Sequence, residues 1–233
     1  MKSFIEAKNL TKKFGSLIAL NNITLHVRQG ERVALLGANG AGKSTFFNIL
    51  LGFLQPDQGA SKLFETPSGR LPPETKARFA YISEESALPP WSTPRGLSLF
   101  FSDIYPKWDN ALLEQLICAW KINQDKFCKS MSKGQRRLAE IALFLSTTPD
   151  LLLLDEPFDG LDALMRLTVI CALLDINAKR GLTVLFSSHI VSEAPRLSER
   201  IIVLKEGRVA MDSPLSSLKN SLETDFLSLH AET

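Results

Sequence analysis

Hydrophobic residues follow two different periods in the first half of the chain. Residues 18–27 and 32–36 are rich in β-branched and other apolar residues around the turn signal Gln29-Gly30, which predicts strands. Residues 96–105 and 111–120 instead space their apolar side chains as a helix does, and no strand pattern separates them. The pattern therefore predicts a β-rich region at the start of the chain and a helical region after it.

Apolar runs and helical segments alternate in the second half of the chain. Residues 151–154 are four consecutive leucines, which is typical of a parallel strand buried on both faces. A helix predicted from Ser132 ends at Pro149, and another over residues 162–180 ends at Gly181. The other strands predicted for the same sheet are residues 79–83, 183–186 and 201–204. Strands that alternate with helices predict an α/β protein with a mostly parallel sheet.

These patterns divide the chain into three parts. Residues 1–85 and 149–212 carry the strand signals and form the predicted core. Residues 86–148, which are helical without strands, are predicted to be a subdomain inserted into that core. The tail, residues 213–233, is rich in Ser and Leu, and its leucines at 215, 218 and 222 fit a short amphipathic helix.

Composition narrows the class of protein. The 233 residues include 27 Lys and Arg against 25 Asp and Glu, and a net charge of +2 gives no strong field for nucleic acid, so no nucleic-acid partner is expected. A hydrophobic content of 45% excludes a disordered chain. No run approaches the roughly 20 apolar residues of a membrane span, and the first residues lack the apolar core of a secretory signal. The three cysteines have no metal-type spacing, so we expect reduced thiols.

A glycine-rich segment follows the predicted strand over residues 32–36 and precedes a helical stretch. Its sequence, Gly37-Ala38-Asn39-Gly40-Ala41-Gly42-Lys43-Ser44, fits the phosphate-loop pattern G-x-x-x-x-G-K-[ST]. Glycines let backbone N–H groups converge on phosphate oxygens, and the helix N-terminus adds a positive dipole end. We expect Lys43 to reach the β- and γ-phosphates and Ser44 to ligate Mg²⁺. The residues expected to contact the nucleotide here are Gly37, Asn39, Gly40, Ala41, Gly42, Lys43, Ser44 and Thr45.

Two carboxylates end the four-leucine strand, in the run Leu151-Leu152-Leu153-Leu154-Asp155-Glu156-Pro157. A strand that ends there delivers them to the carboxyl edge of the sheet, beside the phosphate loop. Asp155 suits the Mg²⁺ shell, directly or through water. Glu156 is one residue further and is expected to polarise the attacking water. The sequence therefore predicts a Mg²⁺-dependent site that binds a nucleoside triphosphate and activates water beside it.

A third motif lies one helix before these carboxylates. The segment Ser130-Met131-Ser132-Lys133-Gly134-Gln135-Arg136-Arg137 resembles the signature loop of ATP-binding cassette (ABC) ATPases, usually Leu-Ser-Gly-Gly-Gln. The resemblance extends over residues 4–212, with motif order and spacing in agreement. It implies a P-loop NTPase with a RecA-like, mostly parallel sheet, an N-terminal antiparallel β region and an inserted helical subdomain. It also implies that Lys43, Glu156 and His189 are catalytic.

Further residues match positions of the family's motifs. Phe14 matches the aromatic residue that stacks on adenine, although packing in the core is the alternative. Glu84 occupies the usual position of the Q-loop glutamine, which contacts Mg²⁺ and water; a carboxylate there can ligate a cation but cannot donate a hydrogen bond when ionised. His189 follows Ser187-Ser188 and matches the switch histidine that contacts the γ-phosphate.

The resemblance also implies a dimer interface. Ser132, Gly134 and Gln135 are expected to contact a nucleotide held by a second subunit, and Lys133 departs from the usual glycine. The run Asp159-Gly160-Leu161-Asp162 resembles the D-loop, which crosses that interface, and Asp162 is counted among the nucleotide-binding residues. Two chains, identical or similar, would close around ATP head to tail and separate after hydrolysis.

The family implies separate transmembrane permease subunits as partners, and a position on the cytoplasmic face of the cell membrane. Residues 84–91 would receive a helix from them, with Leu88, Pro89, Pro90 and Trp91 either docking there or packing as a loop. The run Tyr105-Pro106-Lys107-Trp108-Asp109 resembles cassettes of small bacterial exporters. Two alternatives remain: a soluble ABC ATPase that acts on ribosomes or DNA, which usually carries two cassettes or a long coiled coil, and a small-molecule kinase, which the signature segment argues against.

Overall fold

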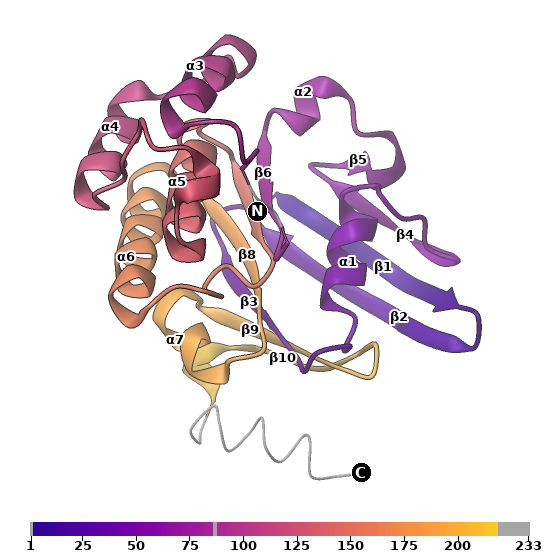
Figure 1. The fold of residues 1–233 in the computed structure, drawn as a ribbon. Helices are drawn as coiled ribbons and strands as arrows, with labels where there is room; N and C mark the ends of the chain where they lie inside the picture. The colour runs from indigo at the N-terminus through magenta and orange to yellow at the C-terminus, as the bar shows by residue number, and fades with distance from the viewer. Residues whose placement is uncertain (1, 86–87, 219–233) are drawn as a thin grey trace.

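The computed structural model describes residues 2–85 and 88–218, and it begins with an antiparallel sheet. This sheet has the strand order β2-β1-β4-β5 and lies to the right in Figure 1. Its strands are β1 (Ser3–Phe14), β2 (Leu17–Arg28), β4 (Gln58–Leu63) and β5 (Thr66–Pro67). Residues of the predicted β-rich start thus form an antiparallel region of their own.

A second sheet of six strands, in the order β10-β9-β3-β8-β7-β6, forms the centre of the molecule. Its strands are β3 (Arg32–Leu36), β6 (Phe79–Ile82), β7 (Leu151–Leu154), β8 (Thr183–Ser188), β9 (Arg200–Lys205) and β10 (Arg208–Pro214). Every pairing is parallel except that of β10 with β9. The mostly parallel sheet predicted from the sequence is therefore present, whereas β10 was not predicted because none of its residues is buried.

The central strands are buried on both faces. In β7, Leu151 and Leu153 join the hydrophobic core that contains helix α1 (Lys43–Leu50) and the antiparallel sheet. Leu152 and Leu154 join the core on the opposite face, which the larger helices cover. Because side chains alternate along a strand, only an unbroken apolar run can fill both cores.

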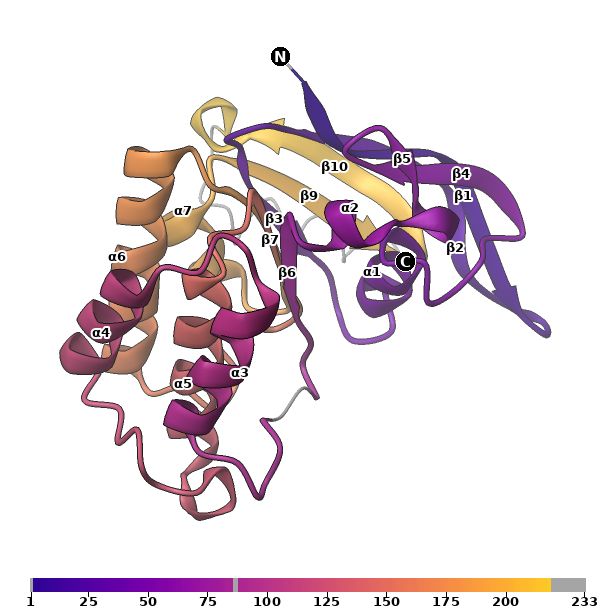
Figure 2. The same ribbon diagram turned by 90° about the horizontal axis from the view of Figure 1, so that it is seen from above.

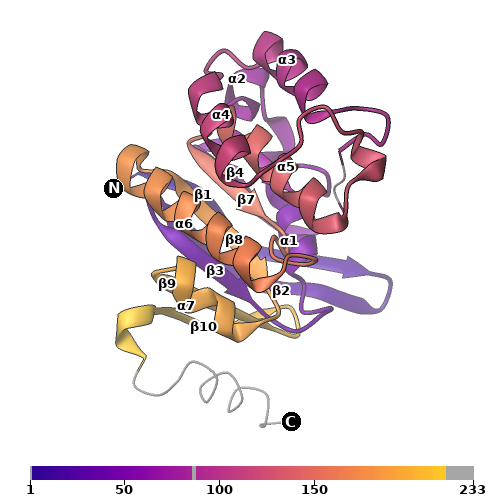
Figure 3. The same cartoon turned by 60° about the vertical axis from the view of Figure 1, so that its left-hand side comes forward.

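The helices longer than α1 lie on one face of the central sheet, as Figures 2 and 3 show, whereas α1 lies on the opposite face with the antiparallel sheet. The longer ones are α3 (Pro94–Ile104), α4 (Asn110–Ala119), α5 (Lys133–Ser146) and α6 (Ala163–Arg180). The short ones are α2 (Pro73–Lys76) and α7 (Ala194–Leu197), with 3₁₀ turns at Ser68–Arg70, Cys128–Ser130, Val191–Glu193 and Leu215–Ser217. Both α3 and α4 contact α5, and the described residues between β6 and β7 contain no strand.

Two expectations concern segments at the limits of the described chain. Of the predicted tail helix, residues 215–217 form one 3₁₀ turn, and Leu222 lies outside the described residues. None of the helices that the structure describes has the length and apolar character needed to cross a bilayer.

Candidate nucleotide-binding site

The phosphate loop, residues 37–44, connects β3 to α1 at the carboxyl edge of the central sheet. Gly42 caps α1 with φ +104°, and a Cβ there would lie 2.5 Å from the carbonyl oxygen of Ala19. At Gly37 a Cβ would lie 2.7 Å from the carbonyl oxygen of Leu204. Both positions therefore require glycine. No side chain caps α1, so its first N–H groups remain available to an anion.

The ammonium group of Lys43 lies folded back over the loop. Its Nζ donates to the carbonyl oxygens of Gly37, at 2.7 Å, and Ala38, at 3.3 Å. It also lies 3.2 Å from Oε1 of Glu156, and both side chains are buried. The loop and the end of β7 are thus joined by a buried ion pair, which brings together two of the predicted catalytic residues.

Asp155 and Glu156 share the hydroxyl of Ser187, which lies on the neighbouring strand β8. Ser187 Oγ donates to Asp155 Oδ1 at 2.5 Å and accepts from the main-chain N–H of Glu156 at 2.8 Å. Glu156 adopts φ +48°, a conformation that turns the chain sharply after the strand. Burial, followed by the charge of Asp155, raises the pKa of Tyr81 on β6. Ser187 was missed by sequence reasoning, although a polar residue in a buried strand is a usable signal.

The residues here fit a magnesium ion. Oε1 of Glu156 is buried and accepts no hydrogen bond of good geometry, although the ammonium of Lys43 lies 3.2 Å from it, and Asp155 supplies a carboxylate that is 2% exposed. The described residues contain no group of three or more His, Cys, Asp and Glu side chains that could hold a metal. Mg²⁺ in nucleotide sites is usually held by one or two carboxylates together with water and phosphate, so a small donor set is expected. Ser44 and Asp155 would hold it.

His189 lies next to the same carboxylate. Its Nδ1 is 2.9 Å from Oε2 of Glu156, and the ring remains partly exposed. The preceding residue, Ser188, donates to Glu193 Oε2 at 2.8 Å, and Arg166 on α6 donates to Glu193 Oε1 at 2.8 Å. Burial raises the pKa of Glu193. This support was not predicted from the sequence, because Arg166 lies 27 positions before Glu193, although Ser188 and Glu193 are five positions apart.

The signature segment, residues 130–137, begins α5 on a different part of the surface. Ser132 caps the helix: its Oγ accepts from the N–H of Gln135 at 3.2 Å, and Gln135 Oε1 accepts from the N–H of Ser132 at 3.1 Å. Gly134 is buried against the D-loop, where a Cβ would lie 2.9 Å from the carbonyl oxygen of Gly160. Asp162 caps α6 by accepting from Met165 N–H at 2.8 Å.

The structure does not bring the signature segment and the phosphate loop together. Among the described residues, no hydrogen bond or ion pair joins residues 130–137 to residues 37–44. The nucleotide-contacting roles of Ser132, Gly134, Gln135 and Asp162 therefore stay predictions that need a second chain.

Phe14 and Glu84 are both on the surface. Phe14 ends β1 with its ring half exposed, so it does not pack in the core, and Lys12 Nζ lies 5.7 Å from the ring centroid. Glu84 is exposed, and its carbonyl oxygen accepts from Arg137 Nη2 at 2.9 Å. Of the predicted docking residues, Leu88 is buried and Trp91 is exposed. Stacking by Phe14 and cation binding by Glu84 stay predictions.

Arg137 was missed by the sequence analysis as a support of the loop after β6. Its guanidinium is buried, donates to the carbonyl oxygens of Ser83, at 2.8 Å, and Glu84, and pairs with Glu140 at 3.2 Å. The signature segment is thus tied to the chain around Glu84 by a single side chain.

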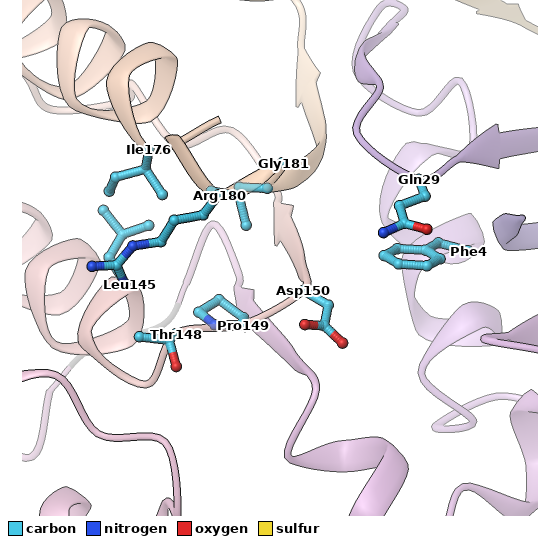
Figure 4. A pocket seen from close by; sticks show the side chains of 10 residues that line it. Phe4, Gln29, Leu145, Thr148, Pro149, Asp150, Ile176, Arg180 and Gly181 are labelled. Carbon is cyan, nitrogen blue, oxygen red and sulfur yellow. The ribbon is translucent and has the colours of Figure 1, made fainter. Parts of the chain in front are cut away.

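A separate pocket of about 110 Å³ lies at the opposite, amino edge of the central sheet. Figure 4 shows Asp150 and Arg180 among its lining side chains, with Phe4 and Gln29 on the other side. None of its lining residues belongs to the phosphate loop. This pocket is therefore distinct from the candidate nucleotide site.

Comparison with known proteins identifies the family. A family model described as ABC transporter matches residues 20–159. The spermidine/putrescine import ATP-binding protein PotA of Chromobacterium violaceum is 35% identical, and the match covers 97% of this chain but 64% of that protein's length. The Nod factor export ATP-binding protein I of Burkholderia lata is 32% identical, with 97% of this chain and 76% of that protein covered.

Solved structures agree with this family. An ATP-binding subunit of an ABC transporter has a TM-score of 0.89 at 28% identity, with 97% of this chain and 99% of that chain covered. A dimeric bacterial ABC transporter cassette has a TM-score of 0.79 at 26% identity, with 92% and 100% covered. The chain belongs to the ABC transporter family and has the fold of its ATP-binding cassettes. By this family membership the chain is an ATPase.

Proposed function

We propose that this chain binds and hydrolyses ATP to drive separate transmembrane permease subunits, and that the assembly exports its cargo. The observation that carries the proposal is the convergence of Lys43, Glu156 and His189 within hydrogen-bonding distance at the mouth of the phosphate loop. A buried carboxylate at the phosphate loop is a candidate acceptor for a proton of the attacking water.

The proposed reaction begins when Lys43 exchanges its partner Glu156 for the triphosphate. The triphosphate draws the ammonium of Lys43 away from Glu156, because phosphate offers more negative charge than one carboxylate. Oε1 of Glu156 is then free to accept a proton from the attacking water, while His189 stays hydrogen-bonded to Oε2. Ser44 and Asp155 would hold a Mg²⁺ ion, which would supply neutralising charge to the phosphate oxygens.

Closure of two cassettes couples this chemistry to movement. Among the described residues, no hydrogen bond or ion pair joins the first turn of α5, capped by Ser132, to its own phosphate loop, so this turn is free to serve a nucleotide held by a second copy. ATP favours the closed pair because its γ-phosphate touches both chains, and hydrolysis removes that contact. The population then shifts towards the open form.

Contact with the permease is proposed beside α3. Trp91 is three-quarters exposed just before that helix, and Phe53, exposed to a similar degree, borders a hollow of about 510 Å³ that Tyr105 and Phe144 also line. This apolar hollow suits a helix of the permease. Such docking would hold the chain on the cytoplasmic face of the membrane.

The direction of transport rests on the run at residues 105–109, because the relatives include importers as well as an exporter. Recovery of a permease polypeptide with the tagged chain in detergent extracts supports the transporter, whereas recovery of ribosomes or DNA supports the soluble alternative. Vesicles that contain the recovered complex then give the direction of movement.

The test of the ATPase proposal is the substitution Glu156→Gln. The amide keeps the shape of the side chain but cannot act as a base, so turnover is expected to fall about 10²- to 10⁴-fold while ATP binding persists. Sedimentation is expected to show a dimer with ATP and a monomer with ADP. Glu114→Gln, on the exposed side of α4, is the matched control and should leave turnover unchanged. Wild-type turnover in Glu156→Gln would contradict the assignment of the base.

A further inference from the structure

The side chain of Lys133 reaches from the first turn of α5 to the D-loop of the same chain. Its Nζ lies 2.5 Å from Oδ2 of Asp159, and both side chains are about half exposed. The Lys133 ammonium holds the pKa of Asp159 below its ordinary value, mainly through this hydrogen bond. A residue that departs from the family's usual glycine therefore makes a specific contact between two of the family's motifs.

The stem of Lys133 also lies across Gly160. Gly160 has φ +76°, and a Cβ there would lie 2.7, 2.9 and 3.1 Å from three methylene carbons of Lys133. On the other side of the contact, Gly134 lies so near that its own Cβ would be 2.9 Å from the carbonyl oxygen of Gly160. The absence of a side chain at Gly134 and Gly160 thus lets the two loops pack closely, with the methylene groups of Lys133 lying over Gly160.

We propose that Lys133 is a positioning residue, which fixes the D-loop against the signature segment before a second copy arrives. The two loops then move as one body, and closure does not have to order them separately. This step rests on the proposed function, since the benefit appears only when two cassettes pair around ATP. The contact itself belongs to the free chain and can be tested there.

The first experiment measures hydrogen exchange of a peptide that covers residues 156–162 in the ATP-free chain. Lys133→Met keeps the stem without the charge, and Asp159→Asn removes the partner. Both variants are expected to exchange about 2- to 5-fold faster, which is the range for loss of a partly exposed ion pair. Lys133→Arg should restore slow exchange, and Lys129→Met, at a nearby lysine, is the control. Unchanged exchange in Lys133→Met would overturn the proposal without touching the proposed function.

The second experiment measures the ATP concentration that produces half-maximal dimer in a Glu156→Gln background. Lys133→Met and Asp159→Asn are each expected to raise this concentration about 2- to 5-fold, and the double variant no further. If Lys133 instead bound phosphate directly, Asp159→Asn would free its ammonium and lower the concentration. That opposite sign would overturn the positioning role. If the Glu156→Gln parent never pairs, the proposed function fails and the exchange experiment alone decides.

Discussion

The two edges of the central sheet carry ion pairs in opposite environments. At the carboxyl edge, Lys43 and Glu156 pair with side chains 6% and 9% exposed. At the amino edge, beside the pocket of Figure 4, Arg180 pairs with Asp109 at 44% and 24% exposure. The same kind of ion pair is therefore buried at one edge and partly exposed to solvent at the other.

This difference in burial distinguishes charged groups that serve the reaction from charged groups that only join two elements of the fold. Burial of an ion pair costs desolvation that the attraction barely repays, so a buried pair adds little net stability. At the carboxyl edge, Lys43 and Glu156 therefore lose little net stability when Lys43 exchanges Glu156 for a phosphate group. At the amino edge, water screens the pair that joins the end of α6 to the start of α4, and each such pair contributes at most about 1 kcal/mol.

The largest expected effect comes from breaking a buried pair at the carboxyl edge. Arg137 and Glu140 are almost fully buried, and the guanidinium also binds two carbonyl oxygens after β6. Arg137→Met is expected to lower the free energy of unfolding by about 3–5 kcal/mol, because it leaves Glu140 buried without this counter-charge. Urea unfolding of the purified chain measures the change.

Two controls make that result specific. Arg95→Met breaks an exposed pair with Asp125 and should cost no more than about 1 kcal/mol. The double variant Arg137→Met with Glu140→Met removes both charges, and it should recover part of the loss because apolar side chains then fill the space. A cost for Arg137→Met as small as that for Arg95→Met would abolish the contrast between buried and exposed ion pairs.

The second-largest expected effect is on the affinity for ATP and not on the stability of the fold. Lys43→Met removes the ammonium that lies between the loop carbonyls and Glu156. ATP affinity is expected to fall about 10- to 100-fold, since hydrogen bonds to charged groups contribute about 1.5–3 kcal/mol. Titration calorimetry measures it, with Lys62→Met on the exposed side of β4 as the control. Unchanged ATP affinity would refute the phosphate-loop assignment.

The carboxyl edge was the easier one to predict from sequence. Its glycines and Lys43 form one continuous run and its two carboxylates form another, and each run follows a strand with a strong apolar signal. Parallel strands bring such ends to one edge of the sheet, so local pattern and topology together were sufficient.

The supports of the site could not be predicted in the same way. Arg137, Ser187 and Glu193 each act on residues that only the tertiary fold brings near, and their types are common in solvated positions. The strand β10 has no buried residue and depends on its pairing with β9. The contact of Lys133 with the D-loop could not be predicted either, because its partner Asp159 lies 26 positions away in sequence.

The smallest expected effect lies at the amino edge and depends on pH. Asp109 caps α4 by accepting from the N–H of Leu112 at 2.9 Å, and this bond, followed by the one from Arg180, holds its pKa below the ordinary value. A depressed pKa stabilises the fold above the unfolded value of about 3.9, and that contribution disappears as pH falls through the folded pKa.

The variant Asp109→Asn keeps the helix cap but removes the charge. The difference in unfolding free energy between pH 6 and pH 2.5 should therefore shrink by less than about 1 kcal/mol. Asp109→Ala should cost about 1 kcal/mol more at both pH values because the cap is lost. An identical pH dependence in Asp109→Asn and the wild type would show that the exposed pair contributes nothing measurable.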